Sequence, residues 1–260
     1  MEFKILTSHL LDAFTEKVNE SPLDKLNKVE KVEIPVDYFQ FYKSVSSVYS
    51  SKIEGENIDF DSYFKHKFLN VKFRTDYTRK ADDLYAAYDF IDNHELNLKN
   101  VQKTHSILSS KLLPKSQQGL IRTNPMFVIN SDDKIEYVAA RPEIVKKEME
   151  KLFEDIELLI QSELNPFEVF YYAALIHLVF VKIHPFQDGN GRTARLMEKW
   201  FLIDKIGQIA SSVQLEKNYY INIKNYYSNL KKPGLEYEDL DYSKSLDFLL
   251  MTATGIDDVK

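Results

Sequence analysis

Apolar residues recur three and four positions apart along most of this chain, the spacing that places side chains on one face of a helix. Only seven glycines and eight prolines occur among 260 residues, so few positions interrupt these amphipathic runs. The pattern predicts helices over roughly residues 5–18, 36–52, 59–69, 76–92, 98–112, 142–162, 166–183, 190–204 and 217–230. We therefore expect an all-α fold.

One segment departs from helical spacing and predicts a β-hairpin on this helical body. The first strand is expected at the apolar run Met126, Phe127, Val128 and Ile129. A polar turn at 130–133 and a second strand at 134–138 complete the hairpin. Such a hairpin leaves unpaired strand edges, which can accept an extended peptide. A hairpin without a binding role is an equally good interpretation from the pattern alone.

The longest apolar stretch, residues 167–183, is short for a membrane span. It also contains Glu168, His177 and Lys182, whose charged or polar groups would be costly in lipid. We interpret it as a buried central helix. It begins at Asn165 followed by Pro166, an N-cap residue and then proline at the first helical position.

Composition indicates a packed, soluble protein with neither nucleic acid nor membrane as a partner. Hydrophobic residues make up 44% and charged residues 28% of the chain, and the net charge of −6 leaves no concentrated basic surface for nucleic acid. Cysteine is absent, which excludes disulfides, thiol catalysis and thiolate metal sites. Residues 1–14 lack the uninterrupted apolar core of a secretory signal, so we expect a cytoplasmic protein.

Candidate chemistry is concentrated in residues 184–195. Pro185 ends the apolar helix, a glycine-rich loop follows from Asp188, and Asn190 is expected to cap the next helix. Free backbone N–H groups and the positive end of the helix dipole at that point form an anion site. Loop and helix start therefore predict a place for phosphate.

Four side chains in this segment are suited to phosphate chemistry. Arg192 and Arg195 are three residues apart and share a helix face, so both can contact one chain of phosphates. Asp188 offers a hard oxygen ligand for Mg²⁺, and His184 is the natural general base for a hydroxyl nucleophile. Each residue alone is more often structural, but their coincidence within one short segment favours a functional site.

Residues 184–195 resemble, position by position, the motif of the Fic family, His-Pro-Phe-x-(Asp/Glu)-Gly-Asn-Gly-Arg-x-x-Arg. The resemblance implies a helical protein adenylyltransferase, in which His184 deprotonates a target hydroxyl that attacks the α-phosphate of ATP. It implies that Asp188 holds Mg²⁺. The implied phosphate contacts are Gly189, Asn190 and Gly191 in the loop, Arg192 at the β-phosphate and Arg195 at the γ-phosphate. Related Doc-type phosphotransferases carry lysine where Gly191 stands here.

The same resemblance suggests roles for segments outside the motif. It implies that the hairpin, within 122–139, is a flap that aligns a target peptide. Tyr226 and Tyr227 resemble an aromatic segment near the adenine in relatives, although two core tyrosines are an equally good interpretation. His177 lies two helical turns before the motif, and we interpret it as a hydrogen-bonded core histidine that supports the loop.

Residues 50–55 resemble the inhibitory motif of the family, (Ser/Thr)-x-x-x-Glu-(Gly/Asn), with Ser50 at its start and Glu54 before Gly55. Taken without the resemblance, the segment is a helix end with a glycine cap. The resemblance implies that Glu54 pairs with Arg195 and prevents it from orienting the γ-phosphate. A charge-assisted arginine–carboxylate pair is strong and geometrically specific.

These observations predict a helical N-terminal segment with the inhibitory motif at 1–60, a Fic core at 61–235 and a tail at 236–260 that packs on the core. The expected partners are ATP and a target protein, which could be the chain itself, and a homo-oligomer is compatible with the sequence. Three alternatives stay open: another nucleotide donor, removal of AMP supported by Glu54, and a regulatory binding module with negligible turnover.

Overall fold

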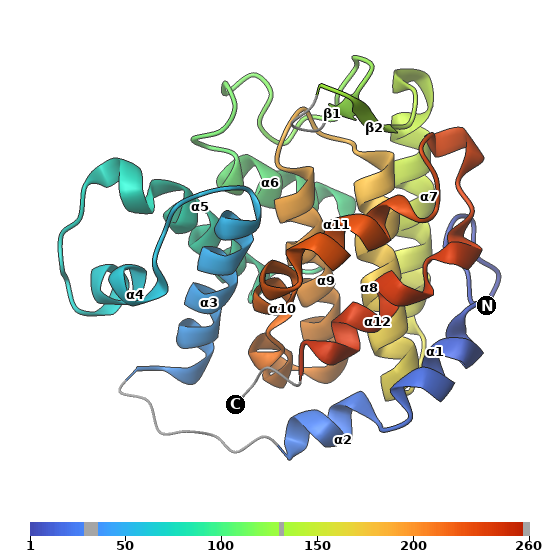
Figure 1. Cartoon of the computed structure of the whole chain (residues 1–260), viewed down its shortest axis with the longest axis horizontal. Helices are drawn as coiled ribbons and strands as arrows, with labels where there is room; N and C mark the ends of the chain where they lie inside the picture. Colours follow the sequence, from blue (N-terminus) through green and yellow to red (C-terminus); the bar gives the residue numbers. More distant parts are fainter. Residues whose placement is uncertain (29–35, 130–132, 257–260) are drawn as a thin grey trace.

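The computed structural model describes residues 1–28, 36–129 and 133–256, with every side chain in these ranges except that of Thr75. The protein is mostly helical, and the described residues contain one two-stranded sheet, as the hydrophobic pattern predicted (Figure 1). The helices are α1 (Leu11–Val18), α2 (Pro22–Asn27), α3 (Tyr38–Ile53), α4 (Phe60–Phe68), α5 (Thr75–Ile91), α6 (Leu98–Leu108), α7 (Pro142–Gln161), α8 (Pro166–Ile183), α9 (Asn190–Ile206), α10 (Leu215–Ile221), α11 (Ile223–Lys231) and α12 (Leu246–Thr254). The strands are β1 (Phe127–Ile129) and β2 (Ile135–Val138).

Helix α8 lies at the centre of the bundle, in contact with α1, α2, α7, α9 and α12. Its N-terminus is fixed by a capping box, in which Asn165 accepts from the backbone N–H of Glu168 and the Glu168 carboxylate accepts from that of Asn165. Among the described residues, α8 alone is long and apolar enough to cross a membrane, and 78% of it is buried inside the protein. That burial is typical of a core helix, as expected from the sequence.

Helices α8 and α9 pack along one another, and the loop between them lies beneath the hairpin at the top of Figure 1. Because α9 starts where α8 ends, residues at both helix ends meet in one small region. The hairpin is antiparallel, with Phe127 opposite Val138 and Val128 opposite Tyr137. Its register shifts after Val128, and most of the turn expected at 130–133 lies outside the described residues.

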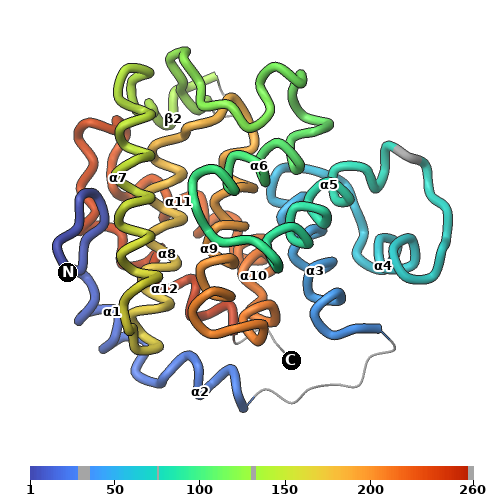
Figure 2. Tube along the Cα trace, turned by 180° about the vertical axis from the view of Figure 1, so that it is seen from behind, coloured from blue at the N-terminus to red at the C-terminus, as the bar shows by residue number. Residues whose placement is uncertain are grey.

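Helices α3, α4 and α5 form a side arm, and both views show α4 projecting away from the bundle (Figures 1 and 2). The arm has a small core of its own, formed by Val48, Ile58, Tyr63, Ala81 and Tyr85. Helix α3 also packs on α10 and contacts α9. The C-terminal end of α3 therefore lies against the helix that carries the candidate phosphate site.

The first helix is shorter than predicted, because α1 begins at Leu11 rather than near residue 5. The backbone N–H groups of Lys4, Ile5 and Leu6 each donate to the carboxylate of Asp155 on α7 at 2.8 Å. These hydrogen bonds hold the segment in a non-helical conformation. They join residues about 150 positions apart, so local periodicity could not show them.

The last predicted helix is divided at Asn222, which separates α10 from α11. The Asn222 side-chain amide donates to the backbone carbonyl of Asn218 at 3.2 Å and to its side-chain oxygen at 2.8 Å. Asparagine competes with the helical hydrogen-bond pattern in this way. The break sets α11 on its own course toward the hairpin end of the bundle (Figure 1).

Two further helices were not predicted, and one helix ends early. Helix α6 ends at Leu108, where the Ser109 hydroxyl donates to the backbone carbonyl of His105 at 2.6 Å. Helix α2 is a short helix capped by Ser21. Helix α12 lies in the tail after the expected core, and its Phe248 is fully buried against α8 and its neighbours.

Candidate active site

Helix α8 ends at Ile183, and the next residue, His184, caps it in a left-handed conformation with φ 54°. Its backbone N–H still donates to the carbonyl of Phe180, while Pro185 disfavours a further helical turn. The side-chain Nδ1 donates to the backbone carbonyl of Val181 at 3.1 Å. A carbonyl only accepts, so this contact places the proton on Nδ1 and leaves the lone pair on Nε2.

The His184 imidazole is neutral at physiological pH. Burial is the main cause that lowers its pKa to about 4; the hydrogen bond to Val181 opposes this effect, the charge of Arg122 adds to it, and the charge of Glu54 opposes it. A neutral imidazole with a free lone pair can accept a proton from a hydroxyl group.

The loop into α9 is built differently from the expectation that Asn190 is an N-cap. Gly189, with φ 79°, is the cap, and Asn190 is the first residue of the helix. The side-chain oxygen of Asn190 accepts from the backbone N–H of Phe186, and its side-chain nitrogen donates to the backbone carbonyl of the same residue, each at 2.8 Å. Asn190 therefore closes the loop, and the first-turn N–H groups of α9 remain the expected place for an anion.

A histidine that the sequence analysis missed supports this loop from α6. His105 is fully buried, and its ring stacks on Phe186 with a centroid distance of 3.7 Å. Nε2 donates to the backbone carbonyl of Asp188 at 2.8 Å, and Nδ1 accepts the backbone N–H of Gly119 at 2.8 Å. Burial lowers the pKa of His105 to about 4, which keeps this neutral tautomer. No motif marks His105, because its partners come from distant loops.

Replacing His105 with alanine is expected to lower the free energy of unfolding by about 3–5 kcal/mol, since it opens a cavity and leaves two buried backbone groups without partners. Urea denaturation of His105→Ala and of the exposed control His9→Ala would measure this difference. Equal stability of the two variants would contradict the role assigned to His105.

Arg122 was also missed, and it joins the hairpin to the end of α8. Its Nε donates to the carbonyl of His184 at 2.7 Å, and its two terminal nitrogens donate to the carbonyls of Asn124 and Ala140. Its own backbone N–H donates to the carbonyl of Pro185 at 2.9 Å. Arg122 thus fixes the base of the hairpin to the turn that carries the candidate general base.

The predicted contact between Glu54 and Arg195 is present. Arg195 Nη2 lies 2.6 Å from Glu54 Oε1, and Arg195 Nε donates to the Ser50 hydroxyl at 3.0 Å. A Cβ atom added to Gly191 would lie 2.8 Å from the Glu54 carboxylate, so the pair needs glycine at that position. Burial alone would raise the pKa of Glu54, but the charges of Arg195 and Arg192 outweigh burial and hold it below the ordinary value.

Arg192, the other predicted phosphate contact, is placed differently. It is buried, its Nη2 lies 4.0 Å from Glu56, and its Nε has no hydrogen-bond partner in the described part of the chain. It does not belong to the described residues that line the cavity next to His184. A buried guanidinium nitrogen without a partner is free to bind an anion, although at this position it lies outside that cavity.

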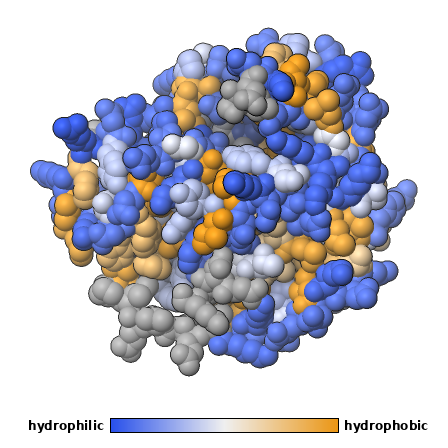
Figure 3. All heavy atoms as spheres, in the orientation of Figure 1, coloured by the Kyte–Doolittle hydropathy of each residue, from blue (hydrophilic) through white to orange (hydrophobic). Residues whose placement is uncertain are grey.

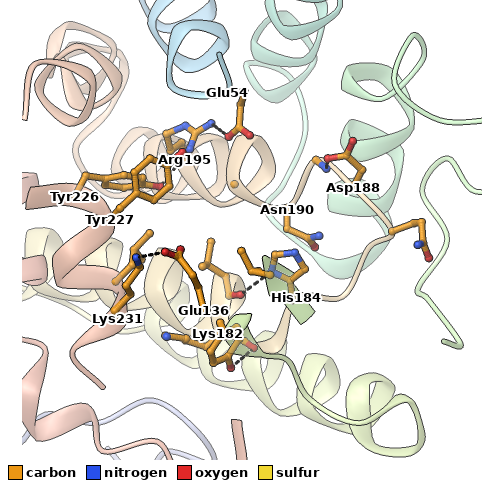
Figure 4. Close-up of a pocket in the computed structure, with 17 residues that line it drawn as sticks. Glu54, Glu136, Lys182, His184, Asp188, Asn190, Arg195, Tyr226, Tyr227 and Lys231 are labelled. Carbon is orange, nitrogen blue, oxygen red and sulfur yellow. Dashed lines mark hydrogen bonds and ion pairs between the residues drawn. The ribbon is translucent and has the colours of Figure 1, made fainter. Parts of the chain in front are cut away.

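A cavity of about 290 Å³ collects most of the predicted site residues (Figure 4). His184, Asp188 and Asn190 lie at one end, and Arg195 with Glu54 lies across the cavity from His184 (Figure 4). The cavity is also lined by Tyr226, Tyr227, Val128, Leu230 and an ion pair between Glu136 and Lys231 at 2.6 Å. The cavity therefore combines polar groups suited to phosphates with aromatic and apolar side chains suited to a base.

Lys182 lines the same cavity and was not assigned a function from the sequence. It is buried, and its ammonium group lies 4.0 Å from the centre of the Tyr137 ring. Burial lowers the pKa of Lys182 to about 8. With a pKa of about 8 the amine is still mostly protonated at neutral pH, so it adds positive charge to the wall of the cavity.

Asp188 suits the Mg²⁺ expected from the sequence. Its side chain is exposed to the cavity, and one carboxylate oxygen accepts the backbone N–H of Gly189 at 2.5 Å. The described residues contain no group of three His, Cys, Asp or Glu side chains placed to hold a metal ion. Mg²⁺ commonly binds through one or two carboxylates together with phosphate oxygens and water, and a single aspartate fits that arrangement.

The two tyrosines differ in position. Tyr226 is only 1% exposed, and its hydroxyl contacts Arg195 and His177. Tyr227 is 40% exposed and donates to the backbone carbonyl of Ile53 at the end of α3. Tyr226 is therefore a core residue that also reaches the cavity, whereas Tyr227 forms part of its wall.

The segment that contains the histidine and the loop has a recognisable counterpart in known proteins. Residues 95–202 match the model of the Fic/DOC family, and this segment includes the whole of 184–195. Relatives that match the chain carry the same family name. Residues 95–202 of this chain form a Fic/DOC-family domain.

The curated relatives of this Fic protein include two animal adenylyltransferases. It is 44% identical over 82 residues to the protein adenylyltransferase Fic of Nematostella vectensis. This matched segment covers 31% of this chain and 17% of that protein. It is 29% identical over 106 residues to the protein adenylyltransferase fic-1 of Caenorhabditis briggsae, covering 41% and 19%. The matched segments thus span less than a fifth of each relative.

Solved structures share the fold of this Fic protein over nearly its whole length. A Fic family protein from Desulfovibrio desulfuricans G20 superposes with a TM-score of 0.76 at 15% identity, covering all of this chain and 75% of the other. Fic-1 from C. elegans superposes with a TM-score of 0.69 at 18% identity, covering 96% and 72%. At these identities the likeness concerns the fold.

Proposed function

We propose that this Fic protein transfers AMP from ATP to a hydroxyl group of a target protein. The observation that carries the proposal is that the neutral His184 imidazole lines the same cavity as Gly189, Asn190 and Gly191 at the start of α9. A base without an anion site could not act on a phosphate ester. An anion site without a base would bind phosphate but would not activate a nucleophile.

In the proposed reaction the target hydroxyl loses its proton to Nε2 of His184 while its oxygen bonds to the α-phosphorus of ATP. The bond from that phosphorus to the bridging oxygen of the β-phosphate breaks, and pyrophosphate leaves. The first-turn N–H groups of α9 and Arg195 stabilise the negative charge on the phosphates. Mg²⁺, held by Asp188, would supply further positive charge to the phosphate oxygens.

The hairpin is proposed to bind the target segment. Hydrophobic side chains gather over the hairpin at the top of Figure 3, where Phe127, Ile129 and Ile135 are 49%, 50% and 53% exposed. In the described residues β1 pairs with β2 alone, so its outer edge offers backbone groups to an extended peptide. This edge lies beside the cavity because Val128 is one of the residues that line it.

Glu54 is proposed to inhibit the reaction. Its carboxylate, whose side chain is 27% exposed, occupies the guanidinium of Arg195 at the end of the cavity opposite His184. A phosphate could take that place only if the ion pair opened. The negative charge of Glu54 would also repel a triphosphate in the cavity.

The acid limb of the pH profile should lie far below that of an ordinary histidine. His184 acts as a base only while its imidazole is neutral, so protonation removes the activity. Burial lowers the pKa of this imidazole to about 4. Removing Glu54 also removes a charge that favours the protonated form. The value of kcat/KM for Glu54→Gly is therefore expected to stay level down to about pH 5. A decline centred near pH 6.5, the ordinary histidine value, would contradict this account.

Labelled ATP tests the proposed reaction class. Glu54→Gly protein with Mg²⁺ is incubated with ATP labelled at either the α- or the γ-phosphate, together with a cell lysate. AMP transfer predicts protein-bound label from the α position and none from the γ position. The reverse result would indicate phosphate transfer. Label from neither would direct the search to other nucleotide donors.

A further inference from the structure

Arg195 is held from two sides by different parts of the molecule. From α3 it is held by Glu54 and by Ser50, which contacts its Nε at 3.0 Å. From α11 it is held by Tyr226, whose hydroxyl oxygen accepts from Arg195 Nη1 at 3.2 Å. Under the proposed function the Glu54 contact must open before a triphosphate enters. The Tyr226 contact lies on another helix and can persist.

The hydrogen bonds behind Tyr226 run in one direction. Arginine only donates, so the Tyr226 oxygen accepts from Arg195, and its O–H is left to donate to His177 Nε2 at 3.1 Å. His177 Nδ1 then carries the ring proton and donates to Glu198 at 2.6 Å. Burial raises the pKa of Tyr226 and lowers that of His177, so both groups stay neutral and keep these roles.

Glu198, at the end of this series, is held in place by the core. It is fully buried, and its carboxylate accepts from the Tyr219 hydroxyl at 2.7 Å and from the Thr252 hydroxyl at 2.6 Å. These partners lie on α10 and α12, while His177 and Tyr226 lie on α8 and α11. With Glu198 on α9, five packed helices thus fix the position of the Tyr226 hydroxyl through hydrogen bonds that do not involve α3.

The position of Arg195 in the cavity indicates which phosphate it would contact. The α-phosphate must lie beside His184 for the hydroxyl to attack, and Arg195 lies across the cavity from His184 (Figure 4). The end of a phosphate chain far from the reacting α-phosphate is the γ-phosphate. ADP lacks that group and would not reach Arg195.

We propose that Tyr226, supported by His177 and Glu198, is a positioning residue that keeps Arg195 directed into the cavity when Glu54 withdraws. Through Arg195 it gives the site its preference for a nucleoside triphosphate over a diphosphate. The inference rests on the proposed function, because it requires a nucleotide in this cavity. In this inference His177 supports Arg195, whereas the sequence led us to expect that it supports the loop.

Binding of two nucleotides to variants of the Glu54→Gly parent tests this role. Calorimetry with Mg²⁺ measures the affinity for two nucleotides, ADP and an analogue of ATP. The analogue has a methylene group between its α- and β-phosphates, so its AMP cannot be transferred. Tyr226→Phe removes only the hydroxyl and is expected to weaken binding of the analogue about fivefold while changing ADP binding less than twofold. Adding Tyr226→Phe to Arg195→Ala should then cause no further loss, because Tyr226 acts through Arg195.

Tyr171→Phe is the matched control, since Tyr171 is another fully buried tyrosine, whose hydroxyl donates to the carbonyl of Thr7. It should leave the ratio of the two affinities unchanged. Equal weakening of both nucleotides by Tyr226→Phe would indicate a merely structural role and overturn the inference, as would no change in either affinity. AMP transfer by the parent is assayed separately. A parent that prefers the triphosphate but transfers nothing would refute the proposed function and leave the positioning role standing.

Discussion

A Glu54→Gly variant is expected to transfer AMP at least tenfold faster than the wild-type protein. The change removes the carboxylate that lies 2.6 Å from Arg195 Nη2 and frees this guanidinium for a phosphate. Hydrogen bonds between charged groups contribute about 1.5–3 kcal/mol, which corresponds to a factor of roughly 10–150 in rate if the pair must open first. Initial rates of labelled AMP incorporation at a fixed concentration of ATP would measure the effect.

Two further variants separate the charge of Glu54 from its shape and its neighbours. Glu54→Gln keeps the size of the side chain and removes its charge, so it should activate in the same direction. Ser50→Ala removes one neutral hydrogen bond to Arg195 Nε and should change the rate less than either Glu54 variant. Equal rates in wild type and Glu54→Gly would refute the inhibitory role.

Loss of the His184 imidazole is expected to reduce AMP transfer by a factor of about 10²–10⁴, the usual contribution of a positioned general base. The variant is best made in the Glu54→Gly background, where activity is measurable. His184→Asn is the preferred substitution because asparagine tolerates the left-handed backbone conformation at this position and cannot take up the proton.

Binding distinguishes a lost base from a damaged site in this variant. In the proposed mode of binding, backbone N–H groups of α9 and Arg195 hold the phosphates, so Glu54→Gly/His184→Asn should bind ATP about as tightly as Glu54→Gly. Calorimetry would show whether it does. Transfer at the parental rate would show that another group removes the proton, and Lys182, also in the cavity, would be the first to replace.

The sequence predicted those features that depend on local patterns. Pro185 and the glycine-rich loop fix a helix end and a helix start within a few residues, so the segment 184–195 could be placed before any tertiary contact was known. The inhibitory motif also led to the correct pairing of Glu54 with Arg195, because the resemblance named both partners.

Features that depend on distant partners could not be predicted in this way. His105 and Arg122 have no motif, and each acquires its role from backbone groups that are far away in the sequence. Asp155 prevents a helix at the N-terminus for the same reason. The capping error at Asn190 arose because its amide serves Phe186 across the loop rather than the helix start. Tertiary hydrogen bonds determined the structure at His105, Arg122 and Asp155, whereas at Asn190 a bond to a residue four positions away did so.

Intact mass spectrometry of three proteins would test the central claim most directly. Wild type, Glu54→Gly and Glu54→Gly/His184→Asn are each incubated with Mg²⁺ and ATP, alone and with a cell lysate, and every protein is examined for an added AMP group. The account predicts AMP on protein in the Glu54→Gly sample, little in the wild type, and none when His184 is also replaced. AMP absent from all three samples, or present equally with and without His184, would contradict it.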